Sequence, residues 1–203
     1  MVDEHVIAIV RLLGLERIHM VPSIKLDHAL ITAFVERWRP ETHSFHLPHG
    51  EMTITLQDVE VIMGMPIEGA AMVGFTKRTW KSMCNEMLGI QIPDENKTML
   101  DGQRIQIKAL VDRIAQPLPP DANELQVHQY ARYYVLALLG DMVFADKSGD
   151  RVHLMWLEFM ENLNDPPKYS WGSAALSWLY RQLCKASKKT AKQIGGALIL
   201  VQL

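Results

Sequence analysis

Residues 124–146, ELQVHQYARYYVLALLGDMVFAD, limit the possible folds most strongly, because this run is apolar on most faces. A surface helix needs one apolar stripe, whereas a helix that is apolar on most faces is stable only when other elements enclose it. Its most apolar part, YYVLALLG, is far shorter than a membrane span and is followed by Asp141. The sequence therefore predicts a buried central helix in a domain that does not enter a membrane.

Seven further segments have the three-to-four residue periodicity of amphipathic helices or end at typical helix stops. They are residues 3–13, 24–38, 56–63, 76–88, 103–115, 151–163 and 171–187. The three prolines of residues 116–123, QPLPPDAN, form a linker at which the core could be divided. The prediction is a mainly α fold, a single helical domain over residues 1–203 with this linker as the place for a subdivision.

Residues 43–55 are the exception, because their apolar residues alternate with a period of two on both sides of a Pro/Gly turn. This pattern predicts one small β-hairpin in the N-terminal third of the chain. Thr55 follows as a helix N-cap, with Asp58 in the capping-box position and Gly64 as a left-handed C-cap. Trp38 lies on the apolar face of the preceding helix.

Histidines and carboxylates near the hairpin raise the possibility of a metal site or of acid–base catalysis. His43, His46 and His49 are three apart, and ligands on a strand should be two apart to share a face, so a metal site is not predicted. Glu51 lies on an exposed turn and Asp58 already caps a helix, which argues against an acid–base pair. The run DKSGD, residues 146–150, lacks the ligand spacing of a calcium loop and is interpreted as a turn between helices.

Charge and cysteine content restrict the class of protein further. The chain has 203 residues, a hydrophobic fraction of 48% and a formal net charge of −2, which is typical of a globular protein and not of a general nucleic-acid binder. Two cysteines far apart, with no signal-like start, indicate reduced thiols inside the cell.

Two clusters of basic residues are each compatible with a solvated surface or with a contact to nucleic acid. One comprises Lys77, Arg78 and Lys81. The other comprises Lys185, Lys188, Lys189 and Lys192, which concentrate positive charge enough to be candidates for contacting a phosphate backbone.

Four blocks of the sequence resemble the plant mobile domain, in the same order. They are LDHALITAFVERWRPETHSFHLPHGEMTITLQDVEVIMGMPIEG, YARYYVLALLGDMVFADKSGDRVHLMWLEFMENL, YSWGSAALSWLYRQLCKAS and IGGALILVQL. The family is similar to MAINTENANCE OF MERISTEMS-like proteins of plants and to domains of plant transposable elements. The resemblance implies a nuclear role in meristem maintenance, genome stability and transposable-element silencing, with a protein-phosphatase-7-like partner. Family domains usually continue past the LVQL block, so the resemblance also implies a domain that is incomplete at its C-terminus.

The family is often labelled aminotransferase-like. A pyridoxal-phosphate enzyme needs a Schiff-base lysine, a partner for the pyridine nitrogen and a phosphate cradle, and the sequence does not offer them as a set. We therefore expect neither enzymatic activity nor a cofactor.

The leading hypothesis is a non-enzymatic interaction module that uses Trp171, Trp178 and Tyr180 to contact a protein partner. Their helical spacing is equally compatible with core positions. The alternative hypothesis is a DNA-binding domain shared with transposable elements, in which residues 55–69 form part of a helix-turn-helix and the hairpin acts as a wing.

Overall fold

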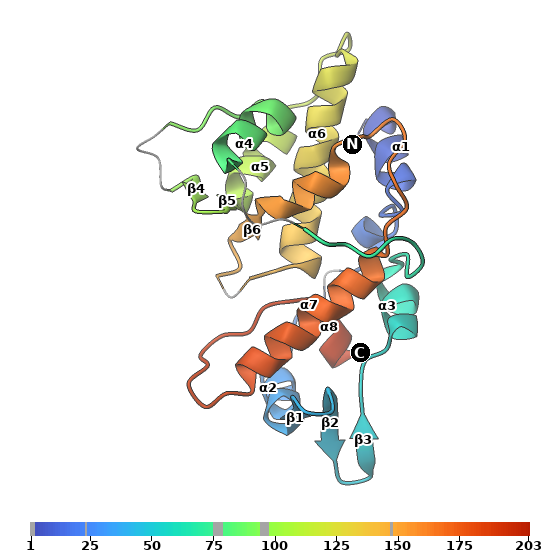
Figure 1. The fold of residues 1–203 in the computed structure, drawn as a ribbon, viewed down its shortest axis with the longest axis vertical. Helices are drawn as coiled ribbons and strands as arrows, with labels where there is room; N and C mark the ends of the chain where they lie inside the picture. The colour runs from blue at the N-terminus through green and yellow to red at the C-terminus, as the bar shows by residue number, and fades with distance from the viewer. Residues whose placement is uncertain (1–2, 23, 75–78, 94–97, 147) are drawn as a thin grey trace.

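A computed structural model of the protein describes residues 3–22, 24–74, 79–93, 98–146 and 148–203. The fold is mainly α-helical, as predicted from the sequence. The prediction of a single hairpin is wrong in detail, because the described residues form two small three-stranded sheets. In Figure 1, helix α6 runs through the upper part of the molecule, α7 crosses its middle, and the first sheet lies at the lower end.

Helix α6 (Glu124–Leu138) is the predicted central helix, and it continues into a π-helical turn, η2 (Leu139–Val143). Asn123 and Gln126 close its first turn with a reciprocal capping box. Three helices pack around it, α1 (Glu4–Leu12), α4 (Trp80–Leu88) and α5 (Ile107–Ile114) (Figure 1). The linker of residues 116–123 joins α5 to α6, which lie against each other.

Two tyrosines of α6 donate hydrogen bonds to carbonyl groups at the C-terminal ends of neighbouring helices. The last carbonyl groups of a helix have no partner within that helix, so buried ends need donors from elsewhere. The Tyr130 hydroxyl donates to the Ile114 carbonyl oxygen at the end of α5, at 2.6 Å. The Tyr133 hydroxyl donates to the Leu88 carbonyl oxygen at the end of α4. The central helix therefore positions α4 and α5 by hydrogen bonds as well as by packing.

Arg132 of α6 is only 6% exposed and also donates hydrogen bonds to backbone carbonyl groups of neighbouring segments. Its guanidinium donates to the carbonyl oxygens of Met160 and Glu161, both at 2.9 Å, and to that of Met87 at 3.3 Å. Burial lowers the pKa of Arg132, while the charge of the Glu161 carboxylate acts in the opposite direction. Three backbone carbonyl groups thus accept hydrogen bonds from the charged residue inside the most apolar segment of the chain.

The second sheet was missed by the sequence analysis, which assigned residues 103–106 and 151–153 to helices. Its strands are β4 (Leu100–Asp101), β5 (Arg104–Gln106) and β6 (Arg151–His153). They pair antiparallel in the order β4-β5-β6. The rest of the helix predicted over residues 151–163 is largely a 3-10 helix, η3 (Leu154–Met160).

The first sheet contains the predicted hairpin, β2 (Ser44–Leu47) and β3 (Gly50–Met52). A third strand, β1 (Trp38–Arg39), pairs with β2, so Trp38 belongs to a strand and not to the preceding helix. That helix, α2 (His28–Arg37), begins later than predicted, because the Asp27 carboxylate caps the amides of its first turn.

Helix α3 (Leu56–Met63) follows β3 and confirms the predicted caps. The Thr55 hydroxyl accepts from the Asp58 amide at 3.3 Å, and the Asp58 carboxylate accepts from the Thr55 amide at 2.7 Å. Gly64 ends the helix at φ 64°. No helix follows it in residues 64–74, and α4 begins only at Trp80. The helix-turn-helix suggested by the sequence is therefore not formed by the described residues.

The capping box leads to a prediction for Thr55→Ala, which should lower the free energy of unfolding by about 1 kcal/mol at neutral pH. The hydrogen bonds from Thr55 hold the pKa of Asp58 below its ordinary value of 3.8. Stability from this contact is therefore present above pH 3.8 and is lost as the pH falls through the lowered pKa. Urea unfolding at neutral pH and at decreasing acid pH would measure the loss.

Thr79 provides the control, because it precedes α4 without making a side-chain cap bond. Thr79→Ala should change the unfolding free energy by less than about 0.5 kcal/mol. An equal loss for both substitutions would show that the cap at Thr55 is not the cause.

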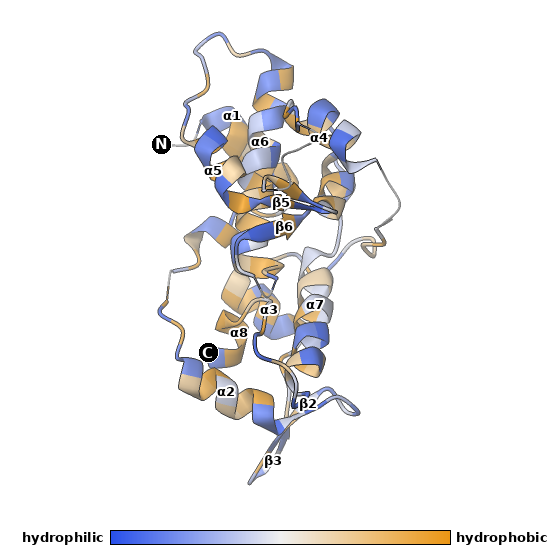
Figure 2. Cartoon of the chain, turned by 90° about the vertical axis from the view of Figure 1, so that its left-hand side faces the viewer, coloured by the Kyte–Doolittle hydropathy of each residue, from blue (hydrophilic) through white to orange (hydrophobic). Residues whose placement is uncertain are grey.

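The chain ends with α7 (Trp171–Ala186), an irregular segment of residues 187–198, and the short helix α8 (Ile199–Gln202). Hydrophilic and hydrophobic residues alternate along α2 and α7, as expected for helices with one buried face (Figure 2). Buried apolar side chains of both ends of the molecule form one continuous core. Among the described residues no helix combines the length and hydropathy required to span a bilayer.

Candidate functional site

The three aromatic residues proposed as partner contacts lie in different environments. Trp171 is 1% exposed and packs against Phe159, with ring centroids 6.1 Å apart. It is therefore a core residue, which corrects its assignment as a contact and agrees with the alternative left open by its spacing. Trp178 and Tyr180 are half-buried. The structure does not bring the three rings to one surface.

Tyr180 fastens the first sheet to α7. Its hydroxyl donates to the Ile54 carbonyl oxygen at 2.6 Å, and its ring stacks on that of His43, with centroids 5.3 Å apart. The Trp38 ring lies 5.3 Å from the same tyrosine, and its indole nitrogen donates to the Cys184 sulfur at 3.3 Å. These contacts give Tyr180 a structural role.

The histidines do not form a metal site in the described residues. His43 precedes β2 in a left-handed conformation, φ 52°, and is stacked on a tyrosine. The His46 imidazole lies 3.9 Å from the Glu51 carboxylate and is largely exposed. In the part of the chain that the structure describes, no three side chains of His, Cys, Asp or Glu are grouped to hold a metal ion.

His46→Ala should therefore change the unfolding free energy by less than about 0.5 kcal/mol, the usual range for an exposed side chain. Addition of a chelator should leave the melting temperature of the wild-type chain unchanged. Thermal melts of both proteins with and without chelator test this. A chelator-dependent decrease of several degrees would contradict it.

The carboxylates of Glu51 in the first hairpin and Asp58 in α3 have pKa values unsuited to acid catalysis at neutral pH. Glu51 accepts a hydrogen bond from the Ser44 hydroxyl at 2.6 Å, which lowers the pKa of Glu51. The pKa of Asp58 is lowered as well. A general acid at neutral pH needs a raised pKa, so both groups act as structural acceptors.

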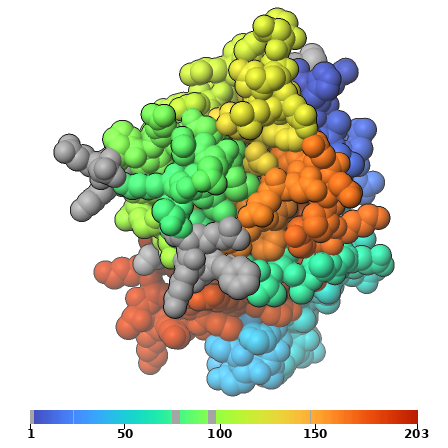
Figure 3. All heavy atoms as spheres, turned by 45° about the horizontal axis from the view of Figure 1, so that its top comes forward, coloured from blue at the N-terminus to red at the C-terminus, as the bar shows by residue number. Residues whose placement is uncertain are grey.

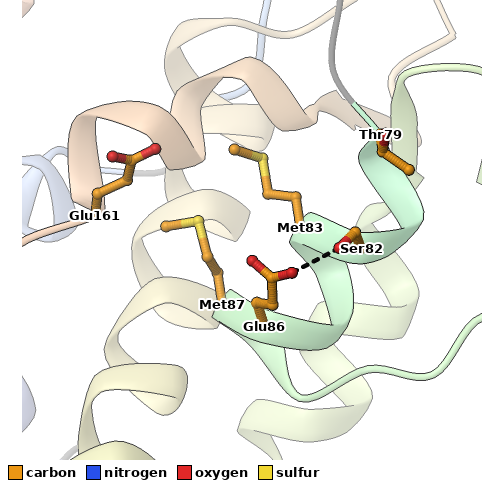
Figure 4. Close-up of a pocket in the computed structure, with 6 residues that line it drawn as sticks. All are labelled: Thr79, Ser82, Met83, Glu86, Met87 and Glu161. Carbon is orange, nitrogen blue, oxygen red and sulfur yellow. Dashed lines mark hydrogen bonds between the residues drawn. The ribbon is translucent and has the colours of Figure 1, made fainter.

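A hollow of about 450 Å³ lies beside α4 and the segment that follows η3. In Figure 4, the Glu86 and Glu161 carboxylates face it with the side chains of Met83 and Met87 between them. The Ser82 hydroxyl donates to Glu86 at 2.6 Å rather than to an imidazole, so no acyl-transfer set is assembled. The two contributing segments are neighbours on one face of the molecule (Figure 3).

The second lysine cluster is exposed, and it borders two further hollows. Lys185 lies near the end of α7, and the other three lysines, Lys188, Lys189 and Lys192, lie on the irregular segment that follows. One hollow, of about 600 Å³, separates this segment from α2 and is bordered by Glu36 as well as lysines. Of the first cluster, Lys77 and Arg78 lie outside the described residues, and Lys81 is exposed on α4.

The other hollow, which we call the α7 groove, also has a volume of about 600 Å³. Its lining residues come from β5, from the turn after η2, from α7 and from the irregular segment. They are Arg104, Asp146, Trp178, Gln182, Lys185, Thr190, Ala191, Lys192 and Gln193. Two of the predicted lysines and one predicted aromatic residue thus meet in one place.

Sequence analysis missed Arg104, Asp146 and Gln182 as members of this groove. The spacing of Trp178, Gln182 and Lys185 along one helix face was a usable signal. Arg104 and Asp146 had none, because they belong to distant segments. Asp146 accepts from the amides of Ser148 and Gly149, as expected for a turn, but the chain then enters strand β6 and not the helix predicted to follow.

Comparison with known proteins places the chain in a family. The model of the plant mobile domain matches residues 14–203. The chain belongs to the plant mobile domain family. It is 43% identical over 190 residues to a serine/threonine-protein phosphatase 7 long form homolog of Arabidopsis thaliana, covering 94% of this chain and 14% of that relative. No solved structure matches it significantly.

Two further Arabidopsis thaliana relatives carry meristem-related names. Protein MAINTENANCE OF MERISTEMS is 36% identical over 97% of this chain and 40% of its own length. Protein MAIN-LIKE 2 is 37% identical over 97% of this chain and 29% of its own length. The chain thus spans less than half of each of these relatives.

Residues of the first block that resembles the plant mobile domain stabilise the fold of this chain. Trp38 of β1 is buried against Phe45 and Tyr180, Thr55 and Asp58 close the first turn of α3, and Gly64 ends that helix. These residues maintain the scaffold of the plant mobile domain.

Proposed function

We propose that this plant mobile domain is a non-enzymatic interaction module of a nuclear plant protein. It acts in meristem maintenance, genome stability and transposable-element silencing, together with a phosphatase-7-like partner. The observation that supports this most is the occurrence of the same module in relatives of different kinds. It makes up 14% of a protein named for phosphatase 7 and 40% of one named for meristem maintenance.

A module shared between proteins with such different names is expected to connect proteins rather than to perform one reaction. The aromatic residues Trp171 and Tyr180 stabilise the fold of the module itself. Contacts to the partner are then made by exposed polar surface, of which the lysine cluster is the most concentrated part.

The test is recovery of partners from plant nuclei with the purified chain as bait, followed by direct binding to a purified phosphatase-7-like protein. We expect the phosphatase-7-like protein in the bound fraction and a purified bait without cofactor absorbance or stoichiometric metal. Lack of binding in both assays would contradict the proposal, as would a cofactor in the bait.

A second candidate function is binding of DNA by the exposed lysines, which is supported by their position on an irregular, protruding segment. A protein that contacts Z phosphates of duplex DNA shows a salt slope of about −0.9Z. Lys188→Ala combined with Lys189→Ala should therefore weaken binding and reduce the slope by about 1.8. Gel-shift titrations at several salt concentrations measure both effects, and an unchanged slope would contradict this function.

A further inference from the structure

Three groups of described residues line the α7 groove. One wall is the face of α7 that carries Trp178, Gln182 and Lys185, at the spacing of one helix face. The opposite wall is the returning chain of residues 190–193. The third group is an ion pair, in which the Arg104 guanidinium donates to the Asp146 carboxylate at 3.0 Å.

Positive charge dominates this groove. Among the described residues, Arg104, Lys185 and Lys192 line it, with one carboxylate, that of Asp146. That carboxylate accepts from Arg104 and also from the amides of Ser148 and Gly149, at 2.8 and 3.1 Å. Three cationic side chains against one carboxylate leave the described lining with a net positive charge, so the groove offers a favourable place for an anion.

An aromatic ring is held rigidly in the same wall. The Trp178 ring makes edge contacts with Phe144 and Trp156, at 6.2 and 6.4 Å between centroids, and its nitrogen donates to the Ala145 carbonyl oxygen at 3.4 Å. The Gly196 amide donates to that same oxygen at 2.8 Å, which draws the returning chain against it. A fixed ring loses little entropy when a planar ligand stacks on it.

Gln182 provides the observation that points to a ligand. It is 8% exposed and lines the groove, yet its side-chain amide makes no hydrogen bond to another described residue. Its amide atoms are not among the fully buried unpaired groups of the described residues, so the amide reaches the open groove, where the polar edge of a ligand can replace water as its partner. A primary amide can both donate and accept, as recognition of a nucleobase edge requires.

We propose that the α7 groove binds one nucleotide unit of a single-stranded nucleic acid, with the base against Trp178 and Gln182 and the phosphate among the three cations. This inference rests on the nucleic-acid function proposed above and narrows it to one ligand. The volume of about 600 Å³ suits a nucleotide-sized ligand and exceeds the need of a phosphate group. A base reaches the aromatic wall only when it is unstacked, which favours single strands over duplexes.

Fluorescence anisotropy with a labelled twelve-residue oligothymidylate, its duplex with oligoadenylate, and thymidine monophosphate as competitor tests the inference. We expect tighter binding of the single strand than of the duplex, and competition by the mononucleotide at higher concentration. Lys185→Ala combined with Lys192→Ala should reduce the single-strand salt slope by about 1.4. Lys168→Ala, just before the opposite end of α7, should leave binding unchanged.

Two substitutions separate the groove from general electrostatics. Trp178→Leu should weaken single-strand binding at least fivefold, the lower range for loss of one stacked base. Because Trp178 also packs against the core, Gln182→Leu serves as a second variant of similar size, and it should weaken the single strand while leaving the melting temperature unchanged.

The alternative outcomes are distinguishable. Duplex binding that depends on Lys188 and Lys189 but not on Trp178 or Gln182 would overturn the inference and leave the DNA-binding function intact. Absence of binding to either nucleic acid would overturn both. If a phosphoserine peptide binds the groove and oligothymidylate does not, the groove recognises phosphopeptides and the inference is wrong.

Discussion

Replacement of Arg132 by Met should lower the free energy of unfolding by about 4 kcal/mol. The substitution retains most of the apolar length of the side chain but removes the donors to the carbonyl oxygens of Met87, Met160 and Glu161. A buried acceptor left without a partner costs about 1–3 kcal/mol, and three acceptors lose their shared donor together. The ends of α4 and η3 should separate from α6 as a result.

Urea unfolding measured by circular dichroism checks this expectation. Arg132→Lys keeps the charge but replaces the planar fork by a single ammonium group, so we expect a loss intermediate between wild type and Arg132→Met. Arg181→Met is the matched control, because Arg181 is exposed on α7, and it should stay within about 0.5 kcal/mol of wild type. A loss below 1 kcal/mol for Arg132→Met would show that other donors or water replace the guanidinium.

Replacement of Gly64 by Val should cost about 3 kcal/mol, for two separate reasons. The residue has φ 64°, a conformation that costs an ordinary L-residue about 1–2 kcal/mol and a β-branched one at least as much. A Cβ atom at this position would also lie 2.4 Å from the Cβ of Arg17, a contact that requires backbone movement. The end of α3 and the segment around Arg17 must then move apart.

Gly102→Val separates the two causes. Gly102 has nearly the same conformation, φ 59°, but a Cβ atom there would have no other atom within 4 Å. We expect this control to cost only the conformational part, about 1–2 kcal/mol, in the same thermal or urea unfolding measurement. Equal losses for the two substitutions would show that the contact with Arg17 does not contribute.

Local chemistry allowed several elements to be predicted correctly from the sequence. The capping box of Thr55 and Asp58, the C-cap at Gly64 and the enclosed helix that begins at Glu124 appear in the structure, although α6 ends at Leu138 and continues as η2. Each depends on residues within a few positions of one another, so the interactions that form it can be read from a short stretch of sequence. Family membership was equally accessible, because the blocks that carry it are continuous in the sequence.

The second sheet shows where local signals are insufficient. The Asp101–Gly102 dipeptide is a recognised hairpin signal, and it lies at the turn between β4 and β5. Strand β6, however, pairs with β5 across more than forty residues, through pairs such as Ile105 with Val152. Because an isolated strand has no partner within its own segment, its formation depends on what the rest of the fold places beside it.

Tertiary structure alone decided the assignment of the candidate site. The same helical spacing is compatible with a buried or an exposed Trp171, and only the packing of Phe159 and Tyr169 against it placed it in the core. The sequence by itself determined helices such as α3 and α7, the caps of α3, the first hairpin and the lysine cluster, because these follow from neighbouring residues. The α7 groove was determined by the tertiary structure, since Arg104 and Asp146 reach Trp178 only after β5, η2 and α7 have packed together.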